Sequence, residues 1–297
     1  MLWRPIRLTL HMIKFEHSVF ALPFAFTGAL LAFRAGGFDA RGIWRQLLWI
    51  AVAMVAARSA AMAFNRLIDC EIDARNPRTR ERHLPAGLLS PGFAWGFVMA
   101  ASLLLFFAAF ELNRLCLQLA PLALAMLFFY SYTKRFTTLS HLALGICLGI
   151  APAAAWIAVR GALDPRILWL TGAVAFWTAG FDVIYSCQDY DFDCREGLWS
   201  VPRVMGIAAA LRVARALHVL MVVCLLALAG TLHVGALALA GVGTIVALLL
   251  YEHSLVKADD LTRVNAAFFT TNGYVSVLFF LFWAADVFLL RGRGAGL

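Results

Sequence analysis

The chain has 297 residues, of which 63% are hydrophobic and 14% are charged, and its mean hydropathy is +0.82. Because a soluble domain carries about 25% charged and about 45–50% apolar residues, this composition excludes an ordinary water-soluble fold and predicts a lipid-facing surface. The net charge of +8 suits loop orientation and contact with anionic lipid head groups, so we expect no nucleic-acid partner. The six cysteines have no ligand spacing and are interpreted as reduced packing residues.

Apolar runs long enough to cross a membrane recur along the whole sequence. A helix needs about 20 apolar residues to cross the hydrocarbon core, and the runs that meet this length are roughly 15–36, 46–66, 93–112, 114–132, 139–160, 167–187, 210–231, 233–253 and 266–290. We therefore predict an all-α polytopic membrane protein with about nine transmembrane helices around a central cavity. Residues 1–297 are expected to form a single transmembrane domain.

The distribution of Lys and Arg predicts the orientation in the membrane. The N-terminus and the connections at 67–92, 133–138, 188–215 and 254–265 hold fifteen of these residues, and the opposite connections hold eight. Since cytoplasmic loops carry the excess of basic residues, the first set is expected to be cytoplasmic. Two acidic segments then lie on the cytoplasmic side.

The first acidic segment follows the second apolar run. Asn65, Asp69 and Asp73 are spaced four residues apart, so a helix places them along one face. Arg58 lies two turns earlier on nearly the same face, inside the apolar run, where a charge is costly and usually functional. A hard divalent cation such as Mg²⁺ explains the three oxygen-bearing side chains together, because it prefers oxygen ligands and completes its shell with water and substrate phosphate.

A second acidic segment ends the sixth apolar run. Asp189 and Asp193 repeat the four-residue spacing, with Asp191 between them. Each segment continues with an arginine two residues after its last aspartate, Arg75 in the first and Arg195 in the second. One acidic helix end is explained equally well by solvation, but two matching ends on one side of the membrane favour a shared metal–diphosphate site.

Basic residues near these segments are candidates for neutralising phosphate oxygens that a metal does not reach. Arginine makes bidentate contacts with phosphate, and lysine acts as a point charge. The candidates for diphosphate binding are Arg58, Arg66, Tyr130, Lys134, Arg135 and Lys14. Lys134 and Arg135 are also explained as a positive-inside pair that snorkels to the membrane interface.

The two acidic motifs and the basic motif between them resemble those of the UbiA superfamily of intramembrane prenyltransferases: Asn65-Arg66-x-x-Asp69-x-x-x-Asp73, Asp189-x-x-x-Asp193 and Tyr130-x-x-x-Lys134-Arg135. The resemblance covers essentially the whole chain and is closest to the bacterial 4-hydroxybenzoate polyprenyltransferase-like branch. Residues 14–23 and 75–80 are similar to the subgroup linked to menaquinone synthesis by the futalosine route. Many members have Asp where this chain has Arg66, so acceptor identity does not transfer directly from the ubiquinone enzymes.

This resemblance implies Mg²⁺-dependent transfer of a polyprenyl group from polyprenyl diphosphate to an aromatic acid in quinone biosynthesis. It also implies two Mg²⁺ ions that bridge the donor diphosphate, the first held by Asn65, Asp69 and Asp73 and the second by Asp189 and Asp193. The four aspartates are the expected catalytic residues, together with Asp191 as a candidate for deprotonating the acceptor. The expected location is the bacterial inner membrane, with the active site facing the cytoplasm.

The sequence is compatible with more than one acceptor and with more than one class of protein. A 4-hydroxybenzoate-type ring is the first choice of acceptor, a dihydroxynaphthoate for menaquinone is the second, and homologues acting in haem or chlorophyll synthesis share the diphosphate site. A CDP-alcohol phosphotransferase requires an Asp-Gly signature that this chain lacks. A transporter of an anionic or phosphorylated substrate fits the many helices and the intramembrane charge, although its site is expected near the membrane midplane rather than at helix ends.

Overall fold

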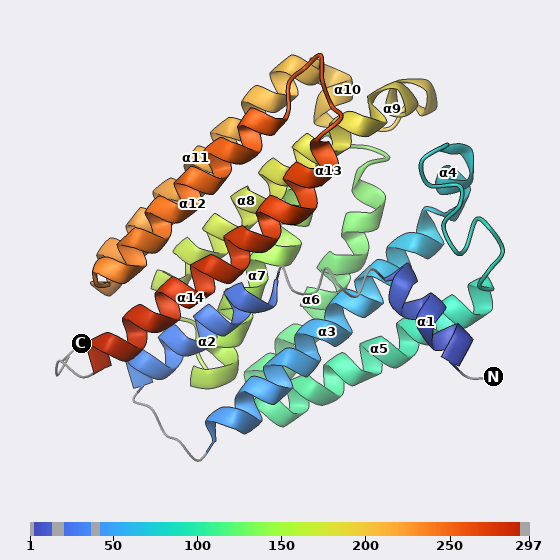
Figure 1. The fold of residues 1–297 in the computed structure, drawn as a ribbon. Helices are drawn as coiled ribbons and strands as arrows, with labels where there is room; N and C mark the ends of the chain where they lie inside the picture. Colours follow the sequence, from blue (N-terminus) through green and yellow to red (C-terminus); the bar gives the residue numbers. More distant parts are fainter. Residues whose placement is uncertain (1–2, 14–20, 37–41, 292–297) are drawn as a thin grey trace.

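The computed structural model describes residues 3–13, 21–36 and 42–291 (Figure 1). These ranges form helices joined by short connections, and they contain no β-strand. The longer helices are α2 (Leu22–Gly36), α3 (Ile43–Ile68), α5 (Pro91–Leu112), α6 (Arg114–Thr133), α7 (Ser140–Arg160), α8 (Leu168–Ser186), α11 (Ile207–Leu232), α12 (Ala236–Leu255) and α14 (Asn272–Arg291). The shorter ones are α1 (Trp3–Met12), α4 (Cys70–Arg75), α9 (Tyr190–Glu196), α10 (Val201–Met205) and α13 (Val264–Ala266).

Helices suited to crossing a membrane dominate the structure. Eight helical segments within the described residues are long and apolar enough to do so, and they correspond to the last eight predicted runs. The ninth candidate, α2, is apolar but has 15 residues, and the run predicted at 15–36 begins at residues that lie outside the described ranges. The all-α membrane architecture is confirmed, whereas the count of nine transmembrane helices stays a prediction.

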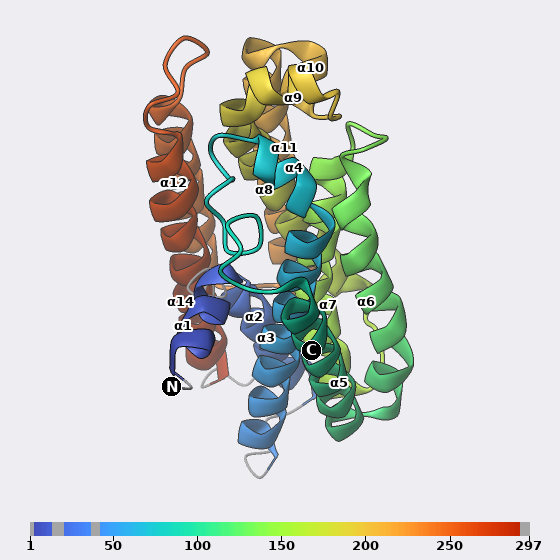
Figure 2. The same cartoon turned by 90° about the vertical axis from the view of Figure 1, so that its right-hand side faces the viewer.

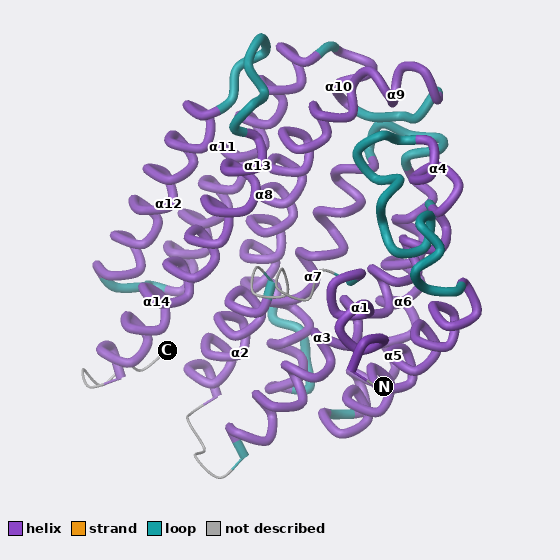
Figure 3. The backbone as a smooth tube through the Cα atoms, turned by 45° about the vertical axis from the view of Figure 1, so that its right-hand side comes forward, coloured by secondary structure: helices purple, strands orange, loops and turns teal. Residues whose placement is uncertain are grey.

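The long helices run roughly side by side, and the short helices α4, α9 and α10 gather at one end of the bundle (Figures 1 and 2). Helix α8 packs extensively against both α7 and α11, and α3 packs against α5. The connections that follow α3 and α8 therefore meet at this end, although they are far apart in the sequence (Figure 3). Both acidic segments belong to these connections.

Two glycines bring the central helices into close contact. A Cβ atom on Gly28 of α2 would lie 2.4 Å from the carbonyl oxygen of Pro152 in α7. A Cβ atom on Gly145 of α7 would lie 2.2 Å from the carbonyl oxygen of Ala175 in α8. Small residues allow such close backbone approach between membrane helices, whose association depends on van der Waals packing rather than on the hydrophobic effect. Helices α2, α7 and α8 are thereby held as one block.

An aromatic cluster fixes the other side of α8. Phe24, Trp177 and Phe279 are buried, and the ring of Phe24 lies 5.0 Å from each of the other two by centroid distance. Offset or tilted rings at such distances are favourable beyond the area that they bury. Helix α8, which leads into the second acidic segment, is therefore held from both sides.

Candidate active site

The two acidic segments lie at breaks in helices α3 and α8. Helix α3 ends at Ile68 and α4 begins at Cys70, and Asp69 between them has φ −91° and ψ 1°. Helix α8 passes through the 3₁₀ turn η3 (Cys187–Asp189) into α9, and Asp189 has φ −97° and ψ 8°. Both aspartates adopt the sparsely populated backbone conformation between the helical and extended regions, where many active-site residues are found. The matching sequence motifs thus have matching backbone geometry.

The predicted helical spacing of Asn65, Asp69 and Asp73 persists through the break. The backbone N–H of Asp69 donates to the Asn65 carbonyl at 2.9 Å, and that of Asp73 donates to the Asp69 carbonyl at 2.7 Å. The Asn65 side-chain amide donates to Asp69 Oδ2 at 3.1 Å. All three side chains line one cavity, so the structure brings together the first predicted ligand set.

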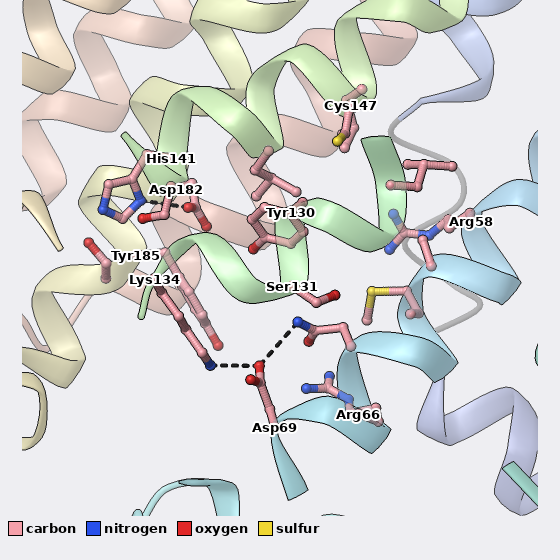
Figure 4. Close-up of a pocket in the computed structure, with 18 of the residues that line it drawn as sticks. Arg58, Arg66, Asp69, Tyr130, Ser131, Lys134, His141, Cys147, Asp182 and Tyr185 are labelled. Carbon is pink, nitrogen blue, oxygen red and sulfur yellow. Dashed lines mark hydrogen bonds and ion pairs between the residues drawn. The ribbon is translucent and has the colours of Figure 1, made fainter. Parts of the chain in front are cut away.

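Asp69 is buried and contacts two cations at the end of α6, of which Figure 4 shows Lys134. Lys134 Nζ donates to Oδ2 at 2.6 Å, and Arg135 Nη2 lies 3.3 Å from Oδ1. Arg135 also donates to the carbonyl of Ile68 at 2.8 Å, which satisfies a carbonyl left without a helical partner at the end of α3. Lys134 lines the cavity, whereas Arg135 is not among its lining residues. The predicted basic pair therefore divides into a lysine that faces the cavity and an arginine that braces the helix end.

Two arginines from the connection between α4 and α5 pair with Asp73 and Asp189. Arg82 Nη1 lies 2.7 Å from Oδ2 of the buried Asp73. Arg78 makes a two-point contact with Asp189, in which Nε lies 2.9 Å from Oδ1 and Nη2 contacts Oδ2. Asn76 also donates to Asp189 Oδ1 at 3.1 Å. Neither arginine is among the predicted site residues, because helical spacing says nothing about the path of this connection.

The Arg78 guanidinium has several N–H donors that suit the oxygens of a diphosphate. Burial acts to lower the pKa of Arg78, but its hydrogen bonds to Asp189 and the attraction of that charge outweigh burial and raise the pKa above its ordinary value. The guanidinium also lies 5.3 Å from the ring centroid of Tyr185 and donates to the Tyr185 hydroxyl at 3.2 Å. Because a planar guanidinium suits phosphate as well as carboxylate, this permanently charged group can bind either anion.

These side chains meet in a cavity of about 990 Å³. Its lining runs from Asp69, directly after α3, back along that helix to Ala53, a distance of about 24 Å at 1.5 Å per residue. Away from the acidic end the lining is mainly apolar, with Arg58 as a charged exception, and includes Leu105, Leu127, Leu144, Leu148 and Phe181. The volume lies at the upper end of the range of small-molecule pockets, about 300–1,000 Å³. The cavity thus joins a charged end to a long apolar interior.

Most of the residues predicted from the sequence line this cavity: Arg58, Asn65, Arg66, Asp69, Asp73, Tyr130, Lys134, Asp189 and Asp193. Arg135 contacts Asp69 from outside the lining. Asp191 is exposed on α9 and is not a lining residue, so the structure does not bring it to the cavity. Lys14 lies outside the described residues.

A histidine–aspartate pair in the cavity wall is absent from the predicted set. His141 Nδ1 lies 2.7 Å from Asp182 Oδ2 (Figure 4), and His141 Nε2 lies 3.3 Å from the backbone N–H of Val201. Because a backbone N–H only donates, Nε2 is the acceptor, and Nδ1 carries the proton donated to Asp182. Asp182 precedes Asp189 by seven residues, which is two helical turns. This spacing is the signal in the sequence that identifies Asp182.

The acidic residues suit a metal that is shared with a substrate. Within the described residues, no three His, Cys, Asp or Glu side chains are close enough to form a metal site by themselves. The cavity does supply carboxylate and amide oxygens from Asn65, Asp69, Asp73, Asp189 and Asp193. Mg²⁺ prefers such donors and is commonly bound by one or two carboxylates together with water and substrate phosphates. The donor set therefore fits Mg²⁺ bound with a diphosphate and does not fit a cage built from protein ligands alone.

The sequence is similar to those of known prenyltransferases. Residues 21–286 match the model of the UbiA prenyltransferase family. The 4-hydroxybenzoate octaprenyltransferase of Vibrio atlanticus is 30% identical over 243 residues, which cover 78% of this chain and 83% of that protein. The 4-hydroxybenzoate octaprenyltransferase of Aliivibrio fischeri strain MJ11 is 28% identical over 250 residues, covering 82% and 84% respectively.

Solved structures show the same architecture. The apo structure of a UbiA homolog from Aeropyrum pernix K1 matches with a TM-score of 0.81 at 33% identity, covering 93% of this chain and 98% of that chain. A UbiA homolog from Archaeoglobus fulgidus bound to DMAPP and Mg²⁺ shares the fold with a TM-score of 0.70 at 19% identity, covering 95% and 99%.

The fold and the cavity define an α-helical membrane protein whose interior joins a charged, aspartate-rich end to an apolar channel. The chain belongs to the UbiA prenyltransferase family and is an enzyme.

Proposed function

We propose that this protein transfers a polyprenyl group from a polyprenyl diphosphate to an aromatic acid of the 4-hydroxybenzoate type in quinone biosynthesis, with Mg²⁺ as its cofactor. The observation that carries the proposal is the division of one cavity into a charged end around Asp69 and Asp189 and an apolar interior, since a polyprenyl diphosphate is divided in the same way. The names of the Vibrio and Aliivibrio relatives support the aromatic acceptor. The homolog bound to DMAPP and Mg²⁺ supports the donor and the metal.

The diphosphate is assigned to the space between the two acidic segments. Asn65, Asp69 and Asp73 are the proposed ligands of one Mg²⁺, and Asp189 and Asp193 are those of a second. When bound there, Mg²⁺ neutralises the charge that develops on the oxygens of the departing diphosphate.

Cations of the protein complete this electrostatic environment. Lys134 and Arg78 already contact Asp69 and Asp189, so their charges lie where the phosphate oxygens are expected. Arg66 and Arg58 line the same cavity from α3. Preorganised charges of this kind stabilise the developing negative charge without reorganisation during the reaction.

Asp182 is the proposed proton acceptor. It pairs with a neutral histidine, whereas Asp69, Asp73 and Asp189 pair with lysine or arginine. In the reaction the allylic C–O bond of the donor breaks, a carbon–carbon bond to the acceptor ring forms, and the ring proton passes to Asp182. His141 holds the carboxylate through Nδ1, as orienting residues do for catalytic bases. Asp182 replaces Asp191 in this role, because Asp191 is not among the residues that line the cavity.

A dihydroxynaphthoate acceptor for menaquinone is the second candidate. The similarity of residues 14–23 and 75–80 to the menaquinone subgroup supports it, and Arg66 weakens a direct transfer of the acceptor from the ubiquinone enzymes. Transport of a phosphorylated substrate loses its support, because the chain belongs to an enzyme family.

We further propose that residues 1–297 act as one domain in the bacterial inner membrane, with the charged end of the cavity toward the cytoplasm. The excess of basic residues in the connections at this end supports the orientation. A long prenyl tail then remains in a hydrophobic environment while its head group reaches the cytoplasmic end.

The proposal is tested with purified protein in liposomes that contain radiolabelled polyprenyl diphosphate and Mg²⁺. 4-Hydroxybenzoate and 1,4-dihydroxy-6-naphthoate are supplied in separate reactions. A labelled lipid product with one acceptor, lost on addition of EDTA, is the expected result and identifies the acceptor. Folded protein that forms no product with either acid contradicts the proposed acceptor class.

A further inference from the structure

A π-helical turn places two phenylalanines in the wall of the cavity. The turn η4 (Ala267–Thr271) lies between α13 and α14, and Phe268 and Phe269 are both lining residues. π-Helical turns are rare in proteins, and those that occur are often found at functional sites. The extra residue changes the direction in which the following side chains point. The role of this turn is not explained by the diphosphate site.

Phe268 faces an aromatic residue next to the second acidic segment. Its ring lies 4.2 Å from that of Tyr185 by centroid distance, with an interplanar angle of 35°. Phe181 makes an edge contact with Phe268 at 5.3 Å. Arg78 contacts both Tyr185 and Asp189, since Nη1 donates to the Tyr185 hydroxyl at 3.2 Å and Nε donates to Asp189 Oδ1 at 2.9 Å. The aromatic pair Tyr185–Phe268 is therefore joined through Arg78 to Asp189, a proposed ligand of the diphosphate metal.

Asn272 holds the π turn from outside the cavity. Its buried side-chain amide donates to the carbonyl of Phe268 at 3.0 Å, while its backbone N–H donates to the carbonyl of Phe269. The indole N–H of Trp177 lies 2.8 Å from Asn272 Oδ1. Because an indole N–H only donates, this contact fixes which end of the amide faces Phe268.

Glu252 completes a network that links three helices. It is fully buried in α12, and its Oε1 accepts from Asn272 Nδ2 at 3.4 Å. Its Oε2 has no hydrogen-bond partner among the described residues. Buried polar atoms without a partner are rare and call for an explanation. The network of Trp177, Glu252 and Asn272 fixes the π turn relative to α8, the helix that also carries Tyr185.

We propose that Phe268, packed against Tyr185, forms the aromatic face that stabilises the allylic cation produced from the donor, and that Asn272 is the positioning residue for this face. The inference rests on the proposed function. When the C–O bond breaks, its electron pair leaves with the diphosphate, and the cation remains in the same cavity that Phe268 and Asp189 line. A cation within about 6 Å of a ring centroid is attracted by the ring face, and the rings also keep water from the cation.

The first test lowers the electron density of the Phe268 ring while nearly preserving the shape of the ring. Phe268 is replaced in turn by mono-, di- and trifluorophenylalanine, which weaken the negative face of the ring stepwise. We expect kcat to fall steadily, by about tenfold over the series, at unchanged donor affinity. The same series at Phe129, which is 58% exposed on α6, is the control and should leave kcat unchanged. A flat series at Phe268 overturns the assignment.

The second test separates positioning from general stability. Asn272→Leu removes both the amide donor and the acceptor for Trp177, whereas Asn272→Asp keeps the acceptor and replaces the donor with a carboxyl oxygen that faces Phe268 and Glu252. We expect each to lower kcat more than donor affinity. In the Asn272→Leu background, Phe268→Leu should have little further effect, since residues that act together show non-additive changes. If the two effects multiply fully, Asn272 is only structural. If Asn272→Leu does not fold, the cycle is measured with Asn272→Asp.

A binding experiment distinguishes failure of this inference from failure of the proposed function. An allylic ammonium analogue is titrated with inorganic diphosphate and Mg²⁺, so that neither acceptor nor turnover is needed. Phe268→Leu should weaken its binding about tenfold. If the wild type prenylates an aromatic acid but the variant binds the analogue equally well, the assignment of Phe268 as the cation-stabilising face is wrong. If the binding loss is observed but no aromatic acid is prenylated, the aromatic face is supported and the acceptor class is wrong.

Discussion

Lys134 and Asp69 form an ion pair with an Nζ–Oδ2 distance of 2.6 Å at the charged end of the cavity. Both residues are assigned to the same diphosphate site, one as a phosphate-binding cation and the other as a metal ligand. Arg82 with Asp73 and Arg78 with Asp189 repeat this arrangement. Neighbouring carboxylates repel one another, and the cation beside each one offsets this repulsion. These pairs hold the acidic segments together and place positive charge where phosphate is expected.

Lys134→Met is predicted to change both metal dependence and turnover. The ammonium and Mg²⁺ compete for Asp69, so the Mg²⁺ concentration that gives half-maximal donor binding should fall. Turnover should nevertheless fall on the order of 100-fold, as it does when one preorganised charge contact to a transition state is lost. Donor binding over a Mg²⁺ titration, together with single-turnover rates, measures both effects. Arg135→Met is the comparison, because Arg135 braces α3 outside the cavity lining and should affect thermal stability more than metal dependence. Wild-type turnover of Lys134→Met contradicts the assignment.

Asp69→Asn and Asp189→Asn are each predicted to abolish turnover in a folded protein. Each substitution removes a proposed metal ligand and preserves the size of the side chain, and losses of 100-fold or more are typical when electrostatic stabilisation of a leaving group is removed. Labelled-product formation is measured together with the thermal unfolding of each variant. Asp191→Asn is the matched control, since this aspartate is exposed on α9, and it should retain wild-type turnover. Near-normal rates in both Asp69→Asn and Asp189→Asn exclude the metal assignment.

Asp182→Asn is predicted to slow transfer without weakening donor binding. The carboxylate is proposed to accept the ring proton, and removing a general base typically lowers the rate about 10²–10⁴-fold. His141→Gln, which retains a side-chain donor toward Asp182, should lose less activity than His141→Leu. Donor affinity measured in the absence of acceptor is the internal control. A large loss of donor affinity in Asp182→Asn places this residue in the diphosphate site instead.

Gly145→Ala is predicted to destabilise the helix bundle. The added Cβ would lie 2.2 Å from the carbonyl oxygen of Ala175, and overpacking of this kind costs about 1–3 kcal/mol. Gly243→Ala in α12 is the matched control, because a Cβ there meets nothing within 4 Å and alanine favours the helix by up to about 1 kcal/mol. Thermal unfolding in detergent compares the two variants. Equal melting temperatures contradict the close contact between α7 and α8.

The positions of the helices and the spacing of the acidic residues along them could be predicted from the sequence because both are local properties. Long apolar runs report on the lipid environment, and the last eight of them correspond to helices of the required length. The four-residue spacing of Asn65, Asp69 and Asp73 already defines one face of a helix. The repeated spacing at Asp189 and Asp193 places the second segment at the end of another helix.

Tertiary structure alone decided which residues share the cavity. Arg78 and Arg82 reach the aspartates through a connection without helical periodicity, so only the folded path shows their contacts. Arg135 and Lys134 are adjacent in sequence and yet only Lys134 lines the cavity, because the end of α6 turns them in different directions. The positioning network of Trp177, Glu252 and Asn272 joins helices separated by many residues. Sequence spacing relates side chains on one helix, whereas contacts between helices depend on how the helices pack.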